Sequence, residues 1–162
     1  MALEQGRDIP RSDILNEGIL PHGKSFMFLE SVEIVEAGKR VTGKLADRTL
    51  PEFAYLADHF PEMPIFPGAL SLEALAELSG IAVLSGLPQD NTKIGVLRKA
   101  DIEWKQPIQP DDLIDLEAEV GFFRQSMGRA KVKAIKNGKI AVEGEITFML
   151  GNKPKPDEEP SV

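Results

Sequence analysis

One histidine and one glutamate lie in a stretch of the chain where acid–base chemistry could take place. His59 sits in a proline-rich loop, and Glu73 lies about two turns inside the apolar segment that follows. An imidazole can take up a proton near neutral pH, and a carboxyl group can donate one. The only other histidine in the sequence is His22. The pairing of His59 with Glu73 therefore predicts a base and an acid near the start of a helix.

Three prolines define the loop. Pro61, Pro64 and Pro67 each fix one backbone φ angle and remove one amide donor, which excludes helix and central strand and predicts an ordered, extended loop. Proline also suits the first turn of a helix, so a helix is expected over residues 68–85, with a stop signal at residues 86–88. Apolar side chains occupy most of the circumference of this helix, which predicts that it is central and buried.

Small residues and carboxylates share one face of the predicted helix: Ala69, Glu73, Ala76, Glu77 and Gly80. Such a face predicts close approach by another chain, a backbone segment or a ligand. A buried ionised carboxylate without a partner is costly, so each glutamate needs one. Glu77 could be the chemical residue in place of Glu73, or it could hydrogen-bond a neighbouring strand.

Backbone amides at the start of the helix add a third kind of chemical group to the base and the acid. The first amides of a helix have no partner inside it, and Gly68 has no side chain to block a carbonyl oxygen. Taken singly, a loop histidine is usually a surface residue and a helical glutamate is usually solvated. A base, an acid and amide donors within one motif instead predict a catalytic site.

The sequence resembles the 3-hydroxyacyl-acyl carrier protein dehydratases of the FabZ type, over about residues 14–150. The segment from His59 to Gly68, together with Glu73, is the most specific part of the resemblance. Three segments carry it in the same order: Leu20-Pro21-His22 with Phe26-Met27-Phe28-Leu29, His59-Phe60-Pro61 through Pro64-Ile65-Phe66-Pro67-Gly68 with Leu72-Glu73-Ala74-Leu75-Ala76, and Trp104-Lys105-Gln106-Pro107-Ile108 with Asp111-Asp112.

The resemblance implies a role for each motif residue. His59 is implied as the catalytic histidine, Glu73 as the catalytic carboxylate and the Gly68 amide as the donor to the thioester carbonyl. Four apolar loop residues could line an acyl tunnel or simply pack the loop onto the core: Phe60, Met63, Ile65 and Phe66.

The implied reaction is a reversible, syn-type dehydration of a 3-hydroxyacyl thioester to a trans-2-enoyl thioester, in fatty-acid or related lipid or polyketide synthesis. The expected substrate is bound to an acyl carrier protein. A homodimer or higher homo-oligomer is implied, with histidine and carboxylate from opposite subunits, and no cofactor or metal is expected. Two alternatives remain open at this stage. They are a hotdog acyl-thioesterase, which uses the helix carboxylate to activate water, and a non-catalytic acyl-binding hotdog protein.

The chain departs from the family pattern at several positions. Asp58 and Glu62 replace common glycines and bring carboxylates near His59, while Glu77 replaces a usual glutamine. The family's basic Arg-Arg-Pro pattern reads Lys105-Gln106-Pro107 here. These changes bear on substrate choice, carrier docking and pH optimum more than on the fold.

Composition fits a small globular enzyme. The chain has 162 residues, enough for one domain with a sizeable core, and it has no cysteine to form a disulfide or thiolate site. A formal net charge of −7 argues against broad nucleic-acid binding. No apolar run is long and charge-free enough to predict membrane insertion, and the first five residues lack a signal-peptide core, so a cytoplasmic protein is expected.

The pattern of elements predicts an α+β hotdog fold, in which an antiparallel sheet wraps around one long central helix. Residues 1–11 are expected to form a flexible arm, 12–150 a single hotdog domain and 151–162 a disordered, proline-rich tail. Expected strands are 25–35, 40–45, 93–104, 113–123, 127–136 and 139–150, with a two-residue turn at Asn137-Gly138. Arg129, Lys131 and Lys133 alternate on one strand face, which predicts a solvated face or, as the alternative, a docking surface for an acidic carrier protein.

Overall fold

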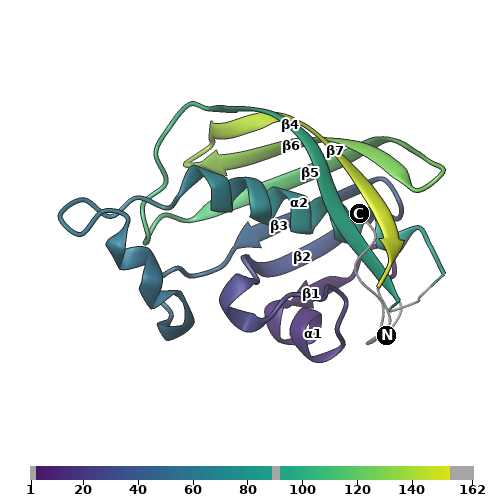
Figure 1. Ribbon diagram of the computed structural model, residues 1–162, viewed down its shortest axis with the longest axis horizontal. Coiled ribbons are helices and arrows are strands. Elements are labelled where there is room, and N and C mark those ends of the chain that lie inside the picture. Colours follow the sequence, from purple (N-terminus) through teal and green to yellow (C-terminus); the bar gives the residue numbers. More distant parts are fainter. Residues whose placement is uncertain (1–2, 89–91, 154–162) are drawn as a thin grey trace.

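One long helix, α2 (Gly68–Ser85), lies against the inner face of a curved antiparallel sheet (Figure 1). The computed structural model describes residues 3–88 and 92–153. The sheet has seven strands in the order β1-β2-β3-β5-β6-β7-β4, and every neighbouring pair is antiparallel. The strands are β1 (Asp8–Pro10), β2 (Leu29–Glu36), β3 (Arg40–Leu45), β4 (Lys93–Trp104), β5 (Ile114–Arg124), β6 (Met127–Lys136) and β7 (Lys139–Asn152). A short helix α1 (Arg11–Asn16) and two 3₁₀ helices, η1 (Lys24–Phe26) and η2 (Pro51–Asp58), complete the described elements.

The core lies between α2 and the sheet. Strand β5 shows how it forms, because its alternating side chains Ile114, Leu116, Ala118 and Val120 are all buried while the intervening ones face outward. α2 packs on β5, β3, β2, β6 and β4 and contributes many fully buried side chains. By length and composition α2 could cross a membrane, but its burial identifies it as the core helix of this fold.

The predicted central helix is confirmed with its bounds. α2 begins at Gly68, directly after Pro67, and Gly86 is its C-cap residue. The strands at 40–45, 93–104 and 127–136 are also confirmed, and the Asn137-Gly138 turn joins β6 to β7. The α+β architecture, with a sheet around one helix, is as predicted.

The N-terminal segment differs from the flexible arm expected for residues 1–11. Strand β1 pairs with β2, and the Gly6 amide donates to the Ile34 carbonyl at 2.7 Å. Leu3 and Ile9 are 4% and 0% exposed, so they belong to the core. A three-residue strand is too short to show a period in sequence, and here it is held by pairing with a distant strand.

β5 and the end of β2 lie within one residue of the predicted bounds, whereas two strand ends differ by more. β2 begins at Leu29 because residues 24–28 leave the sheet, forming η1 and then contacting Arg11 and Glu77. At the other end of the chain β7 runs to Asn152, so residues 151 and 152 belong to the sheet rather than to a tail. The rest of the predicted tail, residues 154–162, lies outside the described residues.

The predicted basic stripe lies on the outer face of β6, and carboxylates accompany it. Lys131 is opposite Glu145 and Lys133 is opposite Glu143 on β7, and Arg129 forms an ion pair with Glu145 at 3.3 Å. Cross-strand partners of opposite charge stabilise a solvated sheet face. This arrangement favours the solvated-face interpretation over a dedicated docking surface.

Candidate active site

His59 is fixed by a pair of hydrogen bonds across its loop. Its Nδ1 lies 2.9 Å from the carbonyl oxygen of Ile65, and the Ile65 amide donates back to the His59 carbonyl at 2.9 Å. Because a carbonyl can only accept, Nδ1 must carry a proton in this contact, so in the neutral imidazole the lone pair is on Nε2. The loop therefore fixes the tautomer of the neutral imidazole and leaves Nε2 as the nitrogen that could accept a proton.

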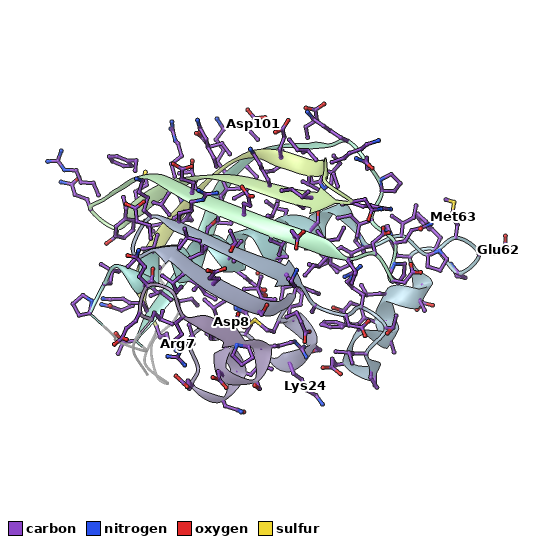
Figure 2. The ribbon with its side chains drawn as sticks, turned by 180° about the vertical axis from the view of Figure 1, so that it is seen from behind. Arg7, Asp8, Lys24, Glu62, Met63 and Asp101 are labelled. Atoms are coloured by element: carbon purple, nitrogen blue, oxygen red, sulfur yellow. The ribbon has the colours of Figure 1, made fainter. Side chains whose placement is uncertain are left out.

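The tip of this loop is a tight turn closed by the backbone of Phe60 and Met63. The Phe60 amide donates to Met63 at 3.4 Å, and the Met63 amide donates to Phe60 at 3.1 Å. Figure 2 shows Glu62 and Met63 at the end of the molecule, pointing away from it. Phe60 and Met63 are 52% and 60% exposed, which is unusual for large apolar side chains held on an ordered turn.

The other two predicted lining residues face inward. Phe66 is 3% exposed, stacks edge-on against Phe28 with a centroid separation of 5.8 Å, and donates its amide to Ile108 at 2.7 Å. Its main role within one chain is therefore core packing, one of the two interpretations left open by the sequence. Ile65 is partly buried and borders, with Phe66 and Gly68, a hollow whose other wall runs from Trp104 to Ile108.

Gly68 begins α2 and has no room for a side chain. A Cβ atom built on Gly68 would lie 2.9 Å from Nε1 of Trp104. The Gly68 carbonyl accepts from Ser71 Oγ at 2.7 Å and from Trp104 Nε1 at 3.2 Å, which anchors the first turn. The Gly68 amide has no acceptor within the helix, so it is available to a carbonyl oxygen of a ligand.

Glu73 faces a separate cavity and contacts the second histidine. Its Oε1 lies 3.2 Å from Nε2 of His22, and both side chains are about one quarter exposed, at 28% and 25%. The two residues are 51 positions apart in sequence, so no local pattern indicated the contact. In the sequence, Pro21 and His22 stood out only as part of a segment that resembles the dehydratase family.

The cavity beside Glu73 is mostly apolar. Of the small-residue face predicted for α2, all members except Ala69 line this cavity. Its lining residues are Leu20, Pro21, His22, Glu73, Ala76, Glu77, Gly80, Leu84, Lys93, Gly95, Val96, Leu97, Phe148 and Leu150.

Glu77 is buried at the inner end of this cavity. It is 2% exposed, and its Oε2 accepts from the Phe28 amide at 2.9 Å, just before β2. Loss of hydration, assisted by the nearby charge of Glu73 and opposed by the Phe28 amide, raises the pKa of Glu77 to about 9. Of the two roles that the sequence left open for Glu77, the hydrogen bond beside a strand is the one observed.

His59 and Glu73 do not meet within one chain. Among the described residues no hydrogen bond or ion pair joins them: His59 contacts the Ile65 carbonyl, and Glu73 contacts His22. The two added carboxylates Asp58 and Glu62 are exposed, and within the described part of the chain neither forms an ion pair with His59. A site that uses both His59 and Glu73 therefore needs a second chain or a substrate that spans the gap.

Comparison with known proteins places this geometry in a family. Residues 20–145 match the FabA-like domain. The chain belongs to the FabA-like family. It is 40% identical over 138 residues to the FabZ 3-hydroxyacyl-[acyl-carrier-protein] dehydratase of Listeria monocytogenes, covering 85% of this chain and 94% of that one. It is also 40% identical over 134 residues to the protein of the same name from Ruminiclostridium cellulolyticum, covering 82% and 92%.

Solved structures confirm the hotdog fold. The dehydratase heterocomplex ApeI:P of Xenorhabdus doucetiae aligns with a TM-score of 0.68 and 18% identity, covering 85% of this chain and 91% of that one. A hypothetical thioesterase of Streptococcus pneumoniae, solved with coenzyme A, aligns at 0.53 with 15% identity, covering 75% and 87%. Since proteins described as a dehydratase and as a thioesterase both have this fold, the fold alone does not distinguish between the two reactions.

Proposed function

We propose that this FabA-like protein is a hydro-lyase that dehydrates 3-hydroxyacyl thioesters, carried on an acyl carrier protein, to trans-2-enoyl thioesters in fatty-acid synthesis. The observation that carries the proposal is the anchoring of His59 Nδ1 on the Ile65 carbonyl, which in the neutral imidazole leaves Nε2 as the nitrogen that can take up a proton. A thioesterase does not need a base at this loop position. The FabZ names of relatives at 40% identity support the same reaction and a cytoplasmic location.

The proposed mechanism assigns one step to each group. His59 Nε2 removes a proton from C2 of the substrate, and the electron pair forms the C2–C3 double bond as the C3–oxygen bond breaks. The Gly68 amide stabilises the charge that develops on the thioester oxygen. Glu73, in its protonated form, gives its proton to the departing hydroxyl, which leaves as water. Proton exchange through solvent then returns His59 and Glu73 to their starting forms.

The direct test of the reaction is product analysis by mass spectrometry. Purified protein is incubated with 3-hydroxyacyl thioesters of several chain lengths, each on an acyl carrier protein and on coenzyme A. We expect loss of one water with the thioester intact, and the reverse addition of water to the enoyl thioester. Release of a free acid would identify a thioesterase instead, and binding without turnover would identify an acyl-binding protein.

The separation of His59 from Glu73 supports a homodimer with shared sites. Among the strands that the structure describes, β4 is the last on its side of the sheet and is 12 residues long, whereas β1 at the opposite edge has only three residues. A long unprotected edge is a natural site for pairing with another copy. Pairing there would extend the sheet across two chains, and the exposed Phe60 and Met63 offer further apolar surface for burial.

Subunit mixing gives a sharp prediction for this assembly. If each site takes His59 from one chain and Glu73 from the other, a hybrid of His59→Ala and Glu73→Gln chains contains one intact site. Equal mixing after dissociation should therefore restore about a quarter of wild-type activity from two nearly inactive proteins, because half of the dimers are hybrids. Light scattering should give the mass of a dimer or higher oligomer. No recovery of activity in verified hybrids, or full activity at the mass of one chain, would rule out shared sites.

A further inference from the structure

Three potential ligands in the lining of the cavity beside α2 lie close together. One ligand atom each from His22, Glu73 and Glu77 can be chosen so that all three lie within 4.8 Å of one another. His22 comes from the segment before η1, while Glu73 and Glu77 are one turn apart on α2 and share its cavity face. The group therefore combines the segment between α1 and η1 with one rigid helix.

A second observation shows that this group lacks a partner. Oε1 of Glu77 is buried without a hydrogen bond to any residue that the structure describes, although Oε2 of the same carboxyl group is satisfied by the Phe28 amide. Nδ1 of His22 is also buried and has no partner in residues 3–88 or 92–153. A buried polar atom without a partner costs free energy, and the cost is greater for a charged group. The unpartnered oxygen belongs to a residue that is 2% exposed and lines the cavity.

No lysine or arginine among the described residues forms an ion pair with Glu77. Lys93 also lines the cavity, but its Nζ binds Oδ1 of Asn152 at 2.7 Å. Arg11, whose charge acts on Glu77 from a distance, is paired with Glu52 at 2.8 Å. Two carboxyl groups and one imidazole form a donor set that suits Zn²⁺, Mn²⁺ or Co²⁺ better than Mg²⁺ or Ca²⁺, which prefer oxygen ligands alone.

We propose that His22, Glu73 and Glu77 bind one divalent transition-metal ion of the zinc class, and that its binding reversibly inhibits the enzyme. The metal-binding part stands on the geometry alone, whereas inhibition rests on the proposed role of Glu73. A carboxylate oxygen of Glu73 that coordinates a cation can no longer carry the proton required by the departing hydroxyl. The cavity of about 100 Å³ leaves room for water on the open side of the ion.

Binding is tested first without substrate. Full-length protein is treated with chelator, dialysed and titrated with Zn²⁺ by calorimetry, and with Co²⁺ by visible absorption, which reports ligand geometry. Wild type is expected to bind one ion per chain. Glu77→Gln keeps an acceptor for the Phe28 amide but removes the carboxyl group, which binds the ion once its proton is displaced. Removing a residue that only supports a metal ligand typically lowers metal affinity by roughly 10- to 100-fold. The Zn²⁺ affinity of Glu77→Gln should fall by more than this, because the ligand itself is lost. Glu62→Gln, which removes an exposed carboxylate outside the cluster, should bind like wild type.

Activity is measured separately in the same buffers. Zn²⁺ should inhibit wild type and Glu62→Gln reversibly, with activity restored by chelator, while Glu77→Gln should retain most of its turnover and resist inhibition at the same concentration. Failure of wild type to bind either ion, or equal binding by Glu77→Gln, would overturn the site and leave a bound water as the partner of Glu77. Binding that follows the predicted pattern without inhibition would keep the metal site but reject the role of Glu73.

Discussion

His59→Ala is expected to abolish both dehydration and hydration while the protein keeps its fold and assembly. His59 is the only imidazole of the motif, and its Nδ1 contact with the Ile65 carbonyl leaves Nε2 of the neutral ring as the nitrogen that would take up the proton. Loss of a positioned general base typically lowers the rate by about 100- to 10,000-fold. The measurement is kcat on a 3-hydroxyacyl thioester, together with the initial rate of the reverse reaction.

Folding controls make this result interpretable. His59 is partly exposed and the Ile65 amide bonds to the His59 backbone, so removing the imidazole leaves that backbone contact in place. Circular dichroism and light scattering should therefore match wild type. Glu62→Gln on the same loop serves as the matched variant and should remain active, because Glu62 points away from the molecule (Figure 2). Turnover like that of wild type in a folded His59→Ala protein would remove His59 from the mechanism.

The sequence predicted the parts of the fold that local chemistry controls. Pro67 and Gly86 bound α2 because proline suits a helix start and glycine a helix end, and the apolar circumference of the segment between them indicated burial. The alternation in β5 predicted which of its side chains enter the core. These patterns depend on neighbours within a few residues, so one sequence was enough.

The parts that could not be predicted depend on contacts between distant segments. Strand β1 is ordered by pairing with β2, and its three residues show no period of their own. Glu77 looked like a possible catalytic acid, and only the Phe28 amide, 49 positions away, identifies it as a buried, hydrogen-bonded group. The contact between His22 and Glu73 likewise joins residues that are 51 positions apart, so no local pattern indicated it. The proposed site combines His59 of one chain with Glu73 of another, and one sequence does not show how two chains pack together.

The remaining prediction separates the two carboxyl groups of α2. Glu73→Gln should lower kcat by about 100- to 10,000-fold, the usual effect of removing a positioned general acid, because an amide of the same size cannot release a proton. Glu77→Gln should have a much smaller effect. Burial raises the pKa of Glu77 to about 9, so its carboxyl group is neutral at pH 7, and a neutral amide can still accept from the Phe28 amide.

The paired design tests the assignment because both changes are isosteric and lie one turn apart on the same helix face. Steady-state kinetics are measured for both variants in chelator-treated buffer at pH 7, with thermal unfolding as the control for stability. Glu73→Gln should keep its contact with His22 and its fold, since Glu73 is partly exposed and the amide oxygen can still accept. If Glu77→Gln proved the more damaging change with folding intact, the proton donor would be Glu77, the buried residue, and Glu73 would become the group that orients His22.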